Sequence, residues 1–238
     1  MCEVMAEVEP DAGLKKFLPL LILVLASACS NAKTSDAGDP WESYNRGAFA
    51  FNQGVDKFVF RPIAKGYRYV TPDPIRSRIG NFADNLLEPV TMVNSFLQGD
   101  FQGGMKSFWR FTLNSTVGIA GINDVATTAG IKKQEEDFGQ TLAVWRTPSG
   151  PYIIIPFFGP SNVRDAAGKV TDWFINPVNV VLNDDGAEYG LAGLQALVQR
   201  ERLLDPIDDI YSTSLDPYAT FRSIYMQRRA ALIKNRST

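Results

Sequence analysis

The side chains that most enzymes use for nucleophilic and acid–base chemistry are scarce in this sequence. It contains no histidine, which excludes Ser-His-Asp and Cys-His catalysis and removes the commonest protein ligand for zinc, copper and iron. Its two cysteines, Cys2 and Cys29, are too few for a disulfide framework, a cysteine-rich zinc site or an iron–sulfur cluster. No serine lies in a Gly-x-Ser-x-Gly elbow. A Ser–Lys dyad stays open, but we expect a protein that is not an enzyme.

Motifs for nucleotides and metal ions are also missing. The sequence has no G-x-G-x-x-G after a predicted strand and no P-loop Gly-Lys-Ser/Thr. Three acidic clusters offer the oxygen ligands of a hard cation, but none follows the alternating pattern of an EF-hand loop. Solvated charge or helix capping explains them better; they are Glu135-Glu136-Asp137, Asp184-Asp185 and Asp208-Asp209. We therefore expect neither a metal site nor a cofactor.

An apolar run near the amino terminus indicates a targeting signal. Lys15 and Lys16 precede residues 17–26, a run of about ten residues that suits a signal-peptide core and is too short to span a bilayer. It ends in Ala26-Ser27-Ala28-Cys29, which resembles a bacterial lipobox. We predict that Cys29 carries a covalent lipid. An ordinary secretory signal, cleaved before a chance cysteine, is the alternative.

The domain boundaries follow from this signal. Residues 1–28 form the predicted signal peptide, although the acidic side chains within residues 1–13 are unusual there, and we expect translation to begin downstream, at position 14. Residues 29–38 are small and polar, which is typical of a flexible tether. Residues 39–238 are expected to form a single helical domain.

The charge balance argues against a nucleic-acid partner. The chain has 24 Lys and Arg against 26 Asp and Glu, whereas nucleic-acid binders concentrate an excess of basic residues. After Cys29, no stretch approaches the about 18 consecutive apolar residues of a membrane span, so we expect the protein to be anchored to a membrane rather than to cross it. Ser30 beside the modified cysteine, in place of aspartate, indicates an outer-membrane address by analogy with bacterial lipoprotein sorting.

Apolar residues recur at helical spacing through most of the mature chain. Asp39 and Pro40 are predicted to cap and begin the first helix, with Glu42 at capping-box spacing. Many aromatic side chains lie in amphipathic segments, which favours helices that lie in a membrane interface. We predict a mainly α fold with at most one short hairpin; the expected helices are 39–60, 61–70, 74–87, 89–98, 100–117, 162–170, 171–182, 187–204 and 216–232.

One stretch favours strands. Residues 142–146 and 152–155 flank a Thr-Pro-Ser-Gly-Pro turn, which predicts that these two segments pair as a hairpin, and Ser161 is expected to cap the helix that follows. Residues 152–158 are almost purely apolar, and two interpretations stay open: burial in the core or contact with lipid. The candidates for membrane contact are Tyr152, Ile153, Ile154, Ile155, Phe157 and Phe158.

Several motifs together resemble the MlaA (VacJ-like) family of phospholipid-transport lipoproteins, and they span roughly residues 39–230. Each is weak by itself, but their combination is specific. They include Asp39-Pro40-Trp41-Glu42-x-Tyr44-Asn45-Arg46, Asn81-Phe82-x-x-Asn85-Leu86-x-Glu88-Pro89, Val93-Asn94-x-x-Leu97-Gln98-Gly99-Asp100, Arg110-Phe111-x-Leu113-Asn114, Asp137-Phe138-Gly139-x-Thr141-Leu142, Pro156-Phe157-x-Gly159-Pro160-Ser161 and Tyr225-x-Gln227-Arg228-Arg229.

The resemblance implies a ring-like bundle of amphipathic helices, embedded in the membrane interface at the inner leaflet of the outer membrane. Its central channel would remove phospholipids from the outer leaflet and pass them to the periplasmic carrier MlaC, with trimeric porins as further partners. A lipid in transit needs a polar path for its headgroup and apolar walls for its chains. Within the matched segment, our candidates for the polar path are Asn81, Asn85, Glu88, Asn94 and Gln98; helix caps and buried hydrogen bonds are the alternative role for each.

Two other functions stay open from the sequence. The first is a structural envelope lipoprotein that scaffolds a porin without moving lipid, which bound phospholipid would distinguish. The second is a lipid hydrolase, against which the missing histidine argues. Composition and periodicity alone indicate only a helical, lipid-anchored envelope protein.

Overall fold

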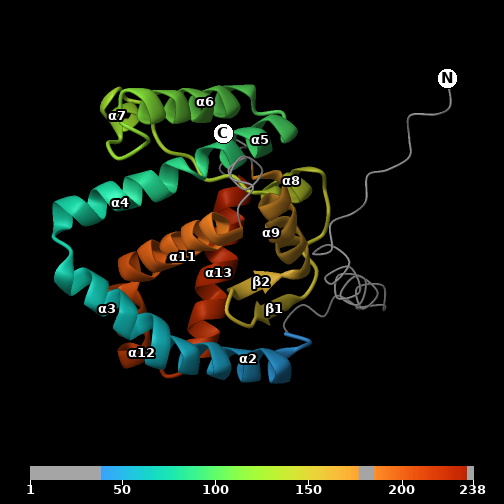
Figure 1. Cartoon of the computed structure of the whole chain (residues 1–238). Coiled ribbons are helices and arrows are strands. Elements are labelled where there is room, and N and C mark those ends of the chain that lie inside the picture. Colours follow the sequence, from blue (N-terminus) through green and yellow to red (C-terminus); the bar gives the residue numbers. More distant parts are fainter. Residues whose placement is uncertain (1–38, 177–184, 235–238) are drawn as a thin grey trace, which may run out of the picture. The chain divides into compact units, whose positions relative to one another are not determined.

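The chain is mainly helical over residues 39–176 and 185–234, which are the residues that the computed structural model describes (Figure 1). The predicted signal peptide 1–28, the tether with Cys29 and half of the helix expected over 171–182 lie outside these residues. Residues 171–175 continue the preceding helix, so the expected boundary at 171 is wrong. Pro40–Thr238 form a unit of their own. None of the described helices is both long and apolar enough to cross a membrane.

The first helical segment is longer than a single α-helix. α2 (Glu42–Val55) continues through a π-helical turn, η1 (Asp56–Phe60), into α3 (Arg61–Val70). Pro62 has no N–H to donate to the preceding turn, so the regular hydrogen-bond pattern cannot run through this point, and the wider turn lies directly before it. The predicted start at Asp39 is wrong by two residues, because Trp41 occupies the N-cap position of α2.

Prolines mark the start of the next two helices, and an aspartate caps the third. α4 (Asp73–Asn85) begins after Pro72, α5 (Glu88–Leu97) carries Pro89 in its first turn, and α6 (Phe101–Thr116) is capped by Asp100, whose carboxylate accepts from Gly103 N. α5 and α6 pack closely. A Cβ on Gly104 would meet the Phe96 ring at 2.4 Å, so this approach requires glycine.

Two short helices and an extended segment come next. Asp124 caps α7 (Val125–Thr128), and Asp137 caps α8 (Phe138–Val144) through its bond to Gln140 N. Between them, residues 131–137 have no regular secondary structure. We call this stretch the polar segment, because it contains two lysines, a glutamine and three acidic residues.

The hairpin is present, but its pairing differs from the prediction. β1 (Tyr152–Ile155) pairs with β2 (Gly159–Asn162) and not with residues 142–146, most of which belong to α8. The Asp137 cap commits the earlier segment to a helix. A tight turn with Phe157 and Gly159 at positive φ then closes the hairpin.

The remaining helices complete the unit. Asn162, not Ser161 as predicted, caps α9 (Val163–Ile175) by accepting from Asp165 N. α11 (Asp185–Arg202), α12 (Leu204–Thr213) and α13 (Pro217–Lys234) follow. A small core joins Ala48, Tyr152, Ile154 and Tyr218, from α2, β1 and α13.

The contacts between elements close a circuit within the described part of Pro40–Thr238. α2 leads through η1 to α3, and α11 joins α3 to α4. α6 joins α4 to α5, and α5 packs on α8, α8 on α9 and α9 on β2. β2 pairs with β1, which returns to α2. Figure 1 shows α11 and α13 crossing between these outer elements. The ring-like arrangement implied by the resemblance therefore has a counterpart in the element contacts.

Candidate functional site

The distribution of polar and apolar side chains is inverted relative to an ordinary soluble protein. Among the described residues, 18 polar or charged residues are buried against 10 hydrophobic ones, of which four are alanines. Large apolar side chains lie on the outside in number, including Phe58 at 76%, Tyr69 at 91% and Phe158 at 75% exposure. Contiguous exposed apolar side chains are typical of surfaces that meet a membrane or a partner.

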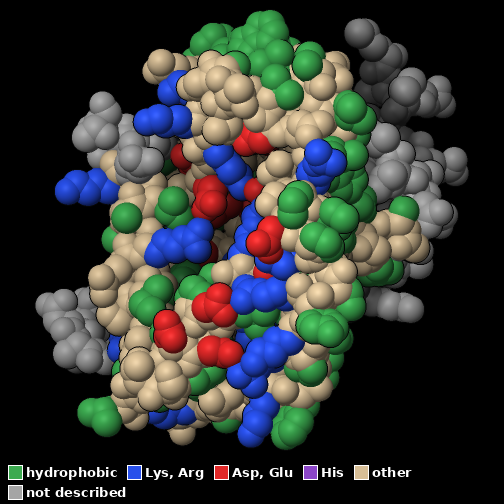
Figure 2. All heavy atoms as spheres, turned by 90° about the vertical axis from the view of Figure 1, so that its left-hand side faces the viewer, with side chains coloured by type: hydrophobic (Ala, Val, Ile, Leu, Met, Phe, Trp, Pro, Cys, Tyr) green, Lys and Arg blue, Asp and Glu red, His purple; other side chains and the backbone are tan. Residues whose placement is uncertain are grey.

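The space-filling view shows where the two kinds of side chain gather. In Figure 2, hydrophobic side chains collect at the top of the face, where Figure 1 places α6 and α7. Charged side chains of both signs surround a hollow near the middle of the same face. This face is the side of the unit on which α3 and α4 lie.

The polar segment 131–137 is held in place by a buried arginine. Arg110 of α6 is 3% exposed, and its guanidinium donates to the Ile131 carbonyl at 2.5 Å and to Glu88 Oε1 at 2.7 Å. It also donates to Thr127 Oγ1 and to Asp124. Burial raises the pKa of Glu88, and the bond from Arg110 opposes that rise. Arg110 thus ties the start of the polar segment to α5, α6 and α7.

The rest of the polar segment is bonded on both sides. Lys133 pairs with Asp84 of α4 at 3.0 Å, and Gln98 at the end of α5 donates to Glu136 at 2.9 Å. On the other side, Arg228 of α13 donates to Glu135 at 2.8 Å. The segment therefore lies between α4 and α5 on one side and α13 on the other.

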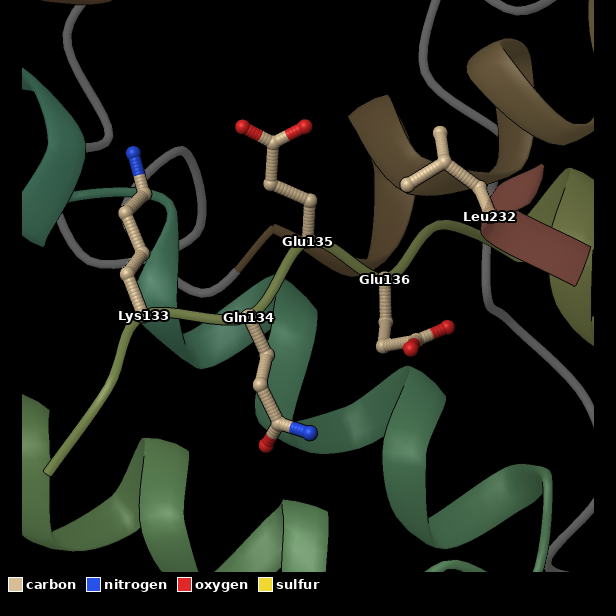
Figure 3. Close-up of a pocket in the computed structure, with 5 residues that line it drawn as sticks. All are labelled: Lys133, Gln134, Glu135, Glu136 and Leu232. Atoms are coloured by element: carbon tan, nitrogen blue, oxygen red, sulfur yellow. The ribbon is translucent and has the colours of Figure 1, made fainter. Parts of the chain in front are cut away.

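A pocket of about 250 Å³ opens along this segment, lined by Lys133, Gln134, Glu135, Glu136 and Leu232 (Figure 3). Because the backbone is extended, Lys133 and Glu135 point to one side and Gln134 and Glu136 to the other. Leu232 reaches toward the pocket from α13. The Gln134 amide oxygen is buried and has no hydrogen-bond partner among the described residues. It is an acceptor that a bound group with an N–H or O–H would satisfy.

A second polar network joins α5, α8 and α9. Asn94 is fully buried; it donates to Asp172 Oδ1 at 2.8 Å and accepts from the Thr141 hydroxyl at 2.8 Å. Asp172 also accepts from Phe138 N. Burial raises the pKa of Asp172 to about 6, although these hydrogen bonds favour the charged carboxylate.

Buried charges also attach α13. Arg229 donates to Asp137 at 2.6 Å and to Asp165 at 3.0 Å, and Tyr225 donates to Asp165 at 2.6 Å. Burial works against the charge on Asp137, but the bond and charge of Arg229 outweigh it and lower the pKa of that carboxyl. α13 is thereby fixed next to the polar segment.

The structure places the five predicted path residues in different surroundings. Gln98 contacts the pocket residue Glu136 directly. Glu88 is linked to the polar segment through Arg110, which bonds to both, and Asn94 lies in the polar network that joins α5 to α8 and α9. Asn85 is buried and donates to Ser115, while Asn81 donates to the Ile122 carbonyl. All five hold neighbouring elements together, and their role toward a lipid stays a prediction.

The predicted membrane-contact residues divide along the hairpin. Tyr152 and Ile154 are buried in the core, so membrane contact is wrong for these two, while Ile153 and Ile155 are half-buried. The alternation of a strand explains this, and Asn45 attaches the strand to α2 by bonding to Tyr152 O and Ile154 N. Phe157 and Phe158 at the turn are exposed, at 63% and 75%.

The sequence interpretation missed the pocket itself. In the sequence, Glu135, Glu136 and Asp137 stand out only as an acidic cluster, and no motif indicates a role for Lys133 or Gln134. The available signal is a run of six consecutive polar residues, 132–137, between the helix predicted over 100–117 and the strand predicted over 142–146. No group of three or more metal-ligating side chains occurs in the described parts of the chain.

Comparison with protein families finds one match that covers most of the chain. The model of the MlaA lipoprotein family matches residues 37–232. Among solved structures, a chain from work on the structural basis for maintenance of bacterial outer membrane lipid asymmetry superposes with a TM-score of 0.73 and 35% identity. The match covers 83% of this chain and 100% of that chain.

Individual relatives agree with the family match. The intermembrane phospholipid transport system lipoprotein MlaA of Escherichia coli K12 is 37% identical over 86% of this chain and 82% of its own length. Its namesake in Haemophilus influenzae is 30% identical over 87% of this chain and 86% of its own. An uncharacterized protein of Rickettsia prowazekii, RP093, is 38% identical over 82% of this chain and 78% of its own.

Proposed function

The chain belongs to the MlaA lipoprotein family, and we propose that it takes phospholipid from the outer leaflet of the outer membrane along a polar interior path. It is an outer-membrane lipoprotein of intermembrane phospholipid transport that maintains lipid asymmetry, and it is not an enzyme. What we propose beyond this is the route, the residues along it and the partners.

The inverted distribution of side chains is the observation that carries the proposal. A phospholipid that crosses between two compartments has a charged headgroup, and taking that group through hydrocarbon is costly unless polar groups accompany it. A polar interior inside an apolar surface meets this need, because the outside can sit among acyl chains while the inside accepts the headgroup. No bond is made or broken in this transfer.

We place the headgroup path along the polar segment 131–137. The pocket combines the Lys133 ammonium, the Glu135 and Glu136 carboxylates and the unpartnered Gln134 amide oxygen. The ammonium suits a phosphate, and the oxygens suit the ammonium or hydroxyl of a headgroup. Leu232 adds an apolar side chain from α13. In this proposal Gln98 orients Glu136, and Asn81, Asn85, Glu88 and Asn94 hold the surrounding helices.

We propose that the exposed aromatic residues lie in the membrane. Phe157 and Phe158 project at the hairpin turn, and the Phe51 ring of α2 meets the Phe157 ring edge to face, with a centroid distance of 5.2 Å. Exposed apolar residues on η1 and α3 extend this surface. A lipid on Cys29 would supply a second attachment, and stable anchoring generally takes two such signals.

The partners are also proposals. A protein that removes phospholipid from one membrane needs an acceptor that carries it through the periplasm, and we propose MlaC for that role. A trimeric porin is the partner that we propose within the membrane. Both rest on membership of the family, and copurification from membranes with the lipidated chain is the direct check.

The first experiment measures phospholipid in the outer leaflet of cells that lack this gene and of cells in which the intact gene is restored. A rise on deletion that restoration reverses is the expected result. An unchanged outer leaflet would contradict the transport function and favour a scaffold that holds a porin without moving lipid.

A second experiment addresses the pocket. Gln134→Leu removes the unpartnered acceptor, and Gln102→Leu makes the same change at an exposed position of α6. We expect slower clearance of outer-leaflet phospholipid in the first variant and normal clearance in the second, at equal protein levels. Equal clearance in both would remove the pocket from the proposed path.

A further inference from the structure

Two stripes of opposite charge face each other between α3 and the α11–α12 junction. Arg61, Lys65 and Arg68 have spacings of four and three on α3, which places them on one face of the helix. Glu201, Asp205 and Asp208 repeat the same spacings across the end of α11 and the start of α12. We call these six residues the charge stripes.

The ion pairs of the charge stripes differ in quality. Arg61 donates two bonds to Asp208 at 2.8 and 2.9 Å, a well-formed bidentate pair. Lys65 reaches the same Asp208 only at 3.6 Å and is 52% exposed. Among the described residues, the Lys65 ammonium therefore has N–H donors without a close acceptor.

The two ion pairs of Arg68 also differ, because one partner is buried and the other is exposed. Its Nε and Nη2 atoms bond to the side chain and carbonyl of Glu201, at 2.8 and 2.7 Å. Its Nη1 is shared by both oxygens of Asp205, and the Asp205 side chain is 78% exposed. Exposed ion pairs contribute little net stability, so an incoming anion displaces Asp205 at small cost.

The surroundings favour a lipid over a free ion. α3 carries its charge stripe on one face, while Ile63 and Val70, both exposed, lie on the opposite face. A helix with these two faces lies at the boundary between headgroups and acyl chains. Figure 2 shows the charged side chains of this side around the hollow.

We propose that the charge stripes bind the headgroup of a zwitterionic phospholipid, a phosphodiester that carries an ammonium group. The phosphate lies between Lys65 and Arg68, which are neighbours at i and i+3, and takes the place of Asp205 on Arg68 Nη1. The released Asp205 carboxylate then accepts the ammonium of the same headgroup. No covalent bond changes. A nearly neutral pair of stripes attracts a polyanion weakly, which favours a headgroup without net charge.

The inference rests on the proposed function and adds a second headgroup site, on α3 rather than in the pocket. Its test uses the purified full-length, lipidated protein in non-ionic detergent and fluorescent short-chain phosphatidylethanolamine or phosphatidylglycerol. Lys65→Gln should weaken binding of both lipids about tenfold. Lys106→Gln, an equal change of charge on α6, should leave binding unchanged. Because Lys65 makes only a long ion pair, its replacement should not alter the folded state, which circular dichroism checks.

A second variant tests the ammonium side. Asp205→Asn should reduce the preference for phosphatidylethanolamine over phosphatidylglycerol about fivefold. Glycerophosphoethanolamine should displace the fluorescent lipid, while inorganic phosphate at the same concentration should not. Equal displacement by phosphate would overturn the headgroup assignment in favour of a plain anion site.

These measurements distinguish failure of the inference from failure of the proposed function. If the wild-type protein binds lipid but Lys65→Gln and Asp205→Asn bind like the wild type, the inference is overturned and the proposed function is untouched. If the wild-type protein binds neither lipid, both are overturned.

Discussion

Two regions of the molecule use the same pair of groups, a guanidinium and a carboxylate, to different ends. Around Arg110 the pair with Glu88 is almost completely excluded from solvent, at 3% and 2% side-chain exposure, and the guanidinium is saturated with hydrogen bonds. In the charge stripes the pair of Arg61 and Asp208 has similar distances but 39% and 31% exposure. The Arg110 pair has one bond, from Nε to Glu88 Oε1, whereas the Arg61 pair is bidentate, but the larger difference is their exposure to solvent.

This difference separates structural from exchangeable ion pairs. A buried carboxylate that loses its partner cannot be solvated, so the cost of breaking the pair is high. At the surface, water or another ion replaces the partner, and the net contribution is small. We infer that the interior network fixes the position of the polar segment, while the charge stripes are free to exchange partners.

The largest effect is expected at Arg110. Arg110→Met should lower the free energy of unfolding by about 3–5 kcal/mol, because it leaves Glu88 buried without its counter-ion. Urea denaturation of the detergent-solubilised protein measures this. A loss below about 1 kcal/mol would mean that water reaches Glu88 and would remove the contrast between the two regions.

The next effect concerns pH and the interior network. The pKa of Asp172 is about 6 in the folded protein and about 3.9 in the unfolded chain. Between these values the folded state binds more protons, so stability falls as the pH rises and is highest at the acidic end. Between pH 3.5 and 7, the titration of Asp172 should lower the free energy of unfolding by about 3 kcal/mol.

Asp172→Asn isolates this contribution, because the amide does not titrate. The difference in unfolding free energy between wild type and variant should shift in favour of the variant by that amount as the pH rises. A difference that is constant with pH would show that Asp172 keeps its ordinary pKa and that its site is solvated.

An intermediate case lies at the inner end of the charge stripes. Arg68 bonds to Glu201, whose side chain is 11% exposed, and Arg76 also lies near that carboxylate. Because a second cation remains, Arg68→Met should cost only about 1 kcal/mol in thermal or urea unfolding. A loss of unfolding free energy as large as that expected for Arg110→Met would show that the ion pair of Glu201 behaves as a buried one.

The smallest effect is expected at Arg61. Arg61→Met should leave the unfolding midpoint unchanged within error, because both members of its pair are substantially exposed. Raising the salt concentration should likewise not distinguish this variant from the wild type. A clear loss of stability would show that the charge stripes act as a structural seam.

Much of the helical architecture was predictable from local signals. Pro62, Pro72 and Pro89 mark helix boundaries, and apolar spacing predicts the helices between them. The hairpin partner was not predictable, because residues 142–146 are as apolar as a strand. Their helix depends on the Asp137 cap and on the packing of α8 against α9, where Gly168 allows the two backbones to touch.

The candidate site was only partly predictable. The predicted path residue Gln98 bonds to the pocket residue Glu136, whereas Gln134 and Lys133 belong to no motif that the sequence offers. From the sequence, Tyr152 and Phe158 are equally suited to lipid or core, and only the packing of Tyr152 against Ala48 and Tyr218 shows that it faces inward. Asn45 holds this strand on α2 through its bonds to the strand backbone. Long-range hydrogen bonds of this kind leave no periodic trace in the sequence.

By itself, the sequence determined the absence of histidine chemistry, the mainly helical fold and the family, because these depend on composition, local spacing and linear motifs. The tertiary structure decided which polar residues are buried, which carboxylates keep a charge and which ion pairs face solvent. Arg110 and Arg61 are the same residue type on amphipathic helices. Their different roles follow from the dielectric surroundings that the folded chain builds around each of them.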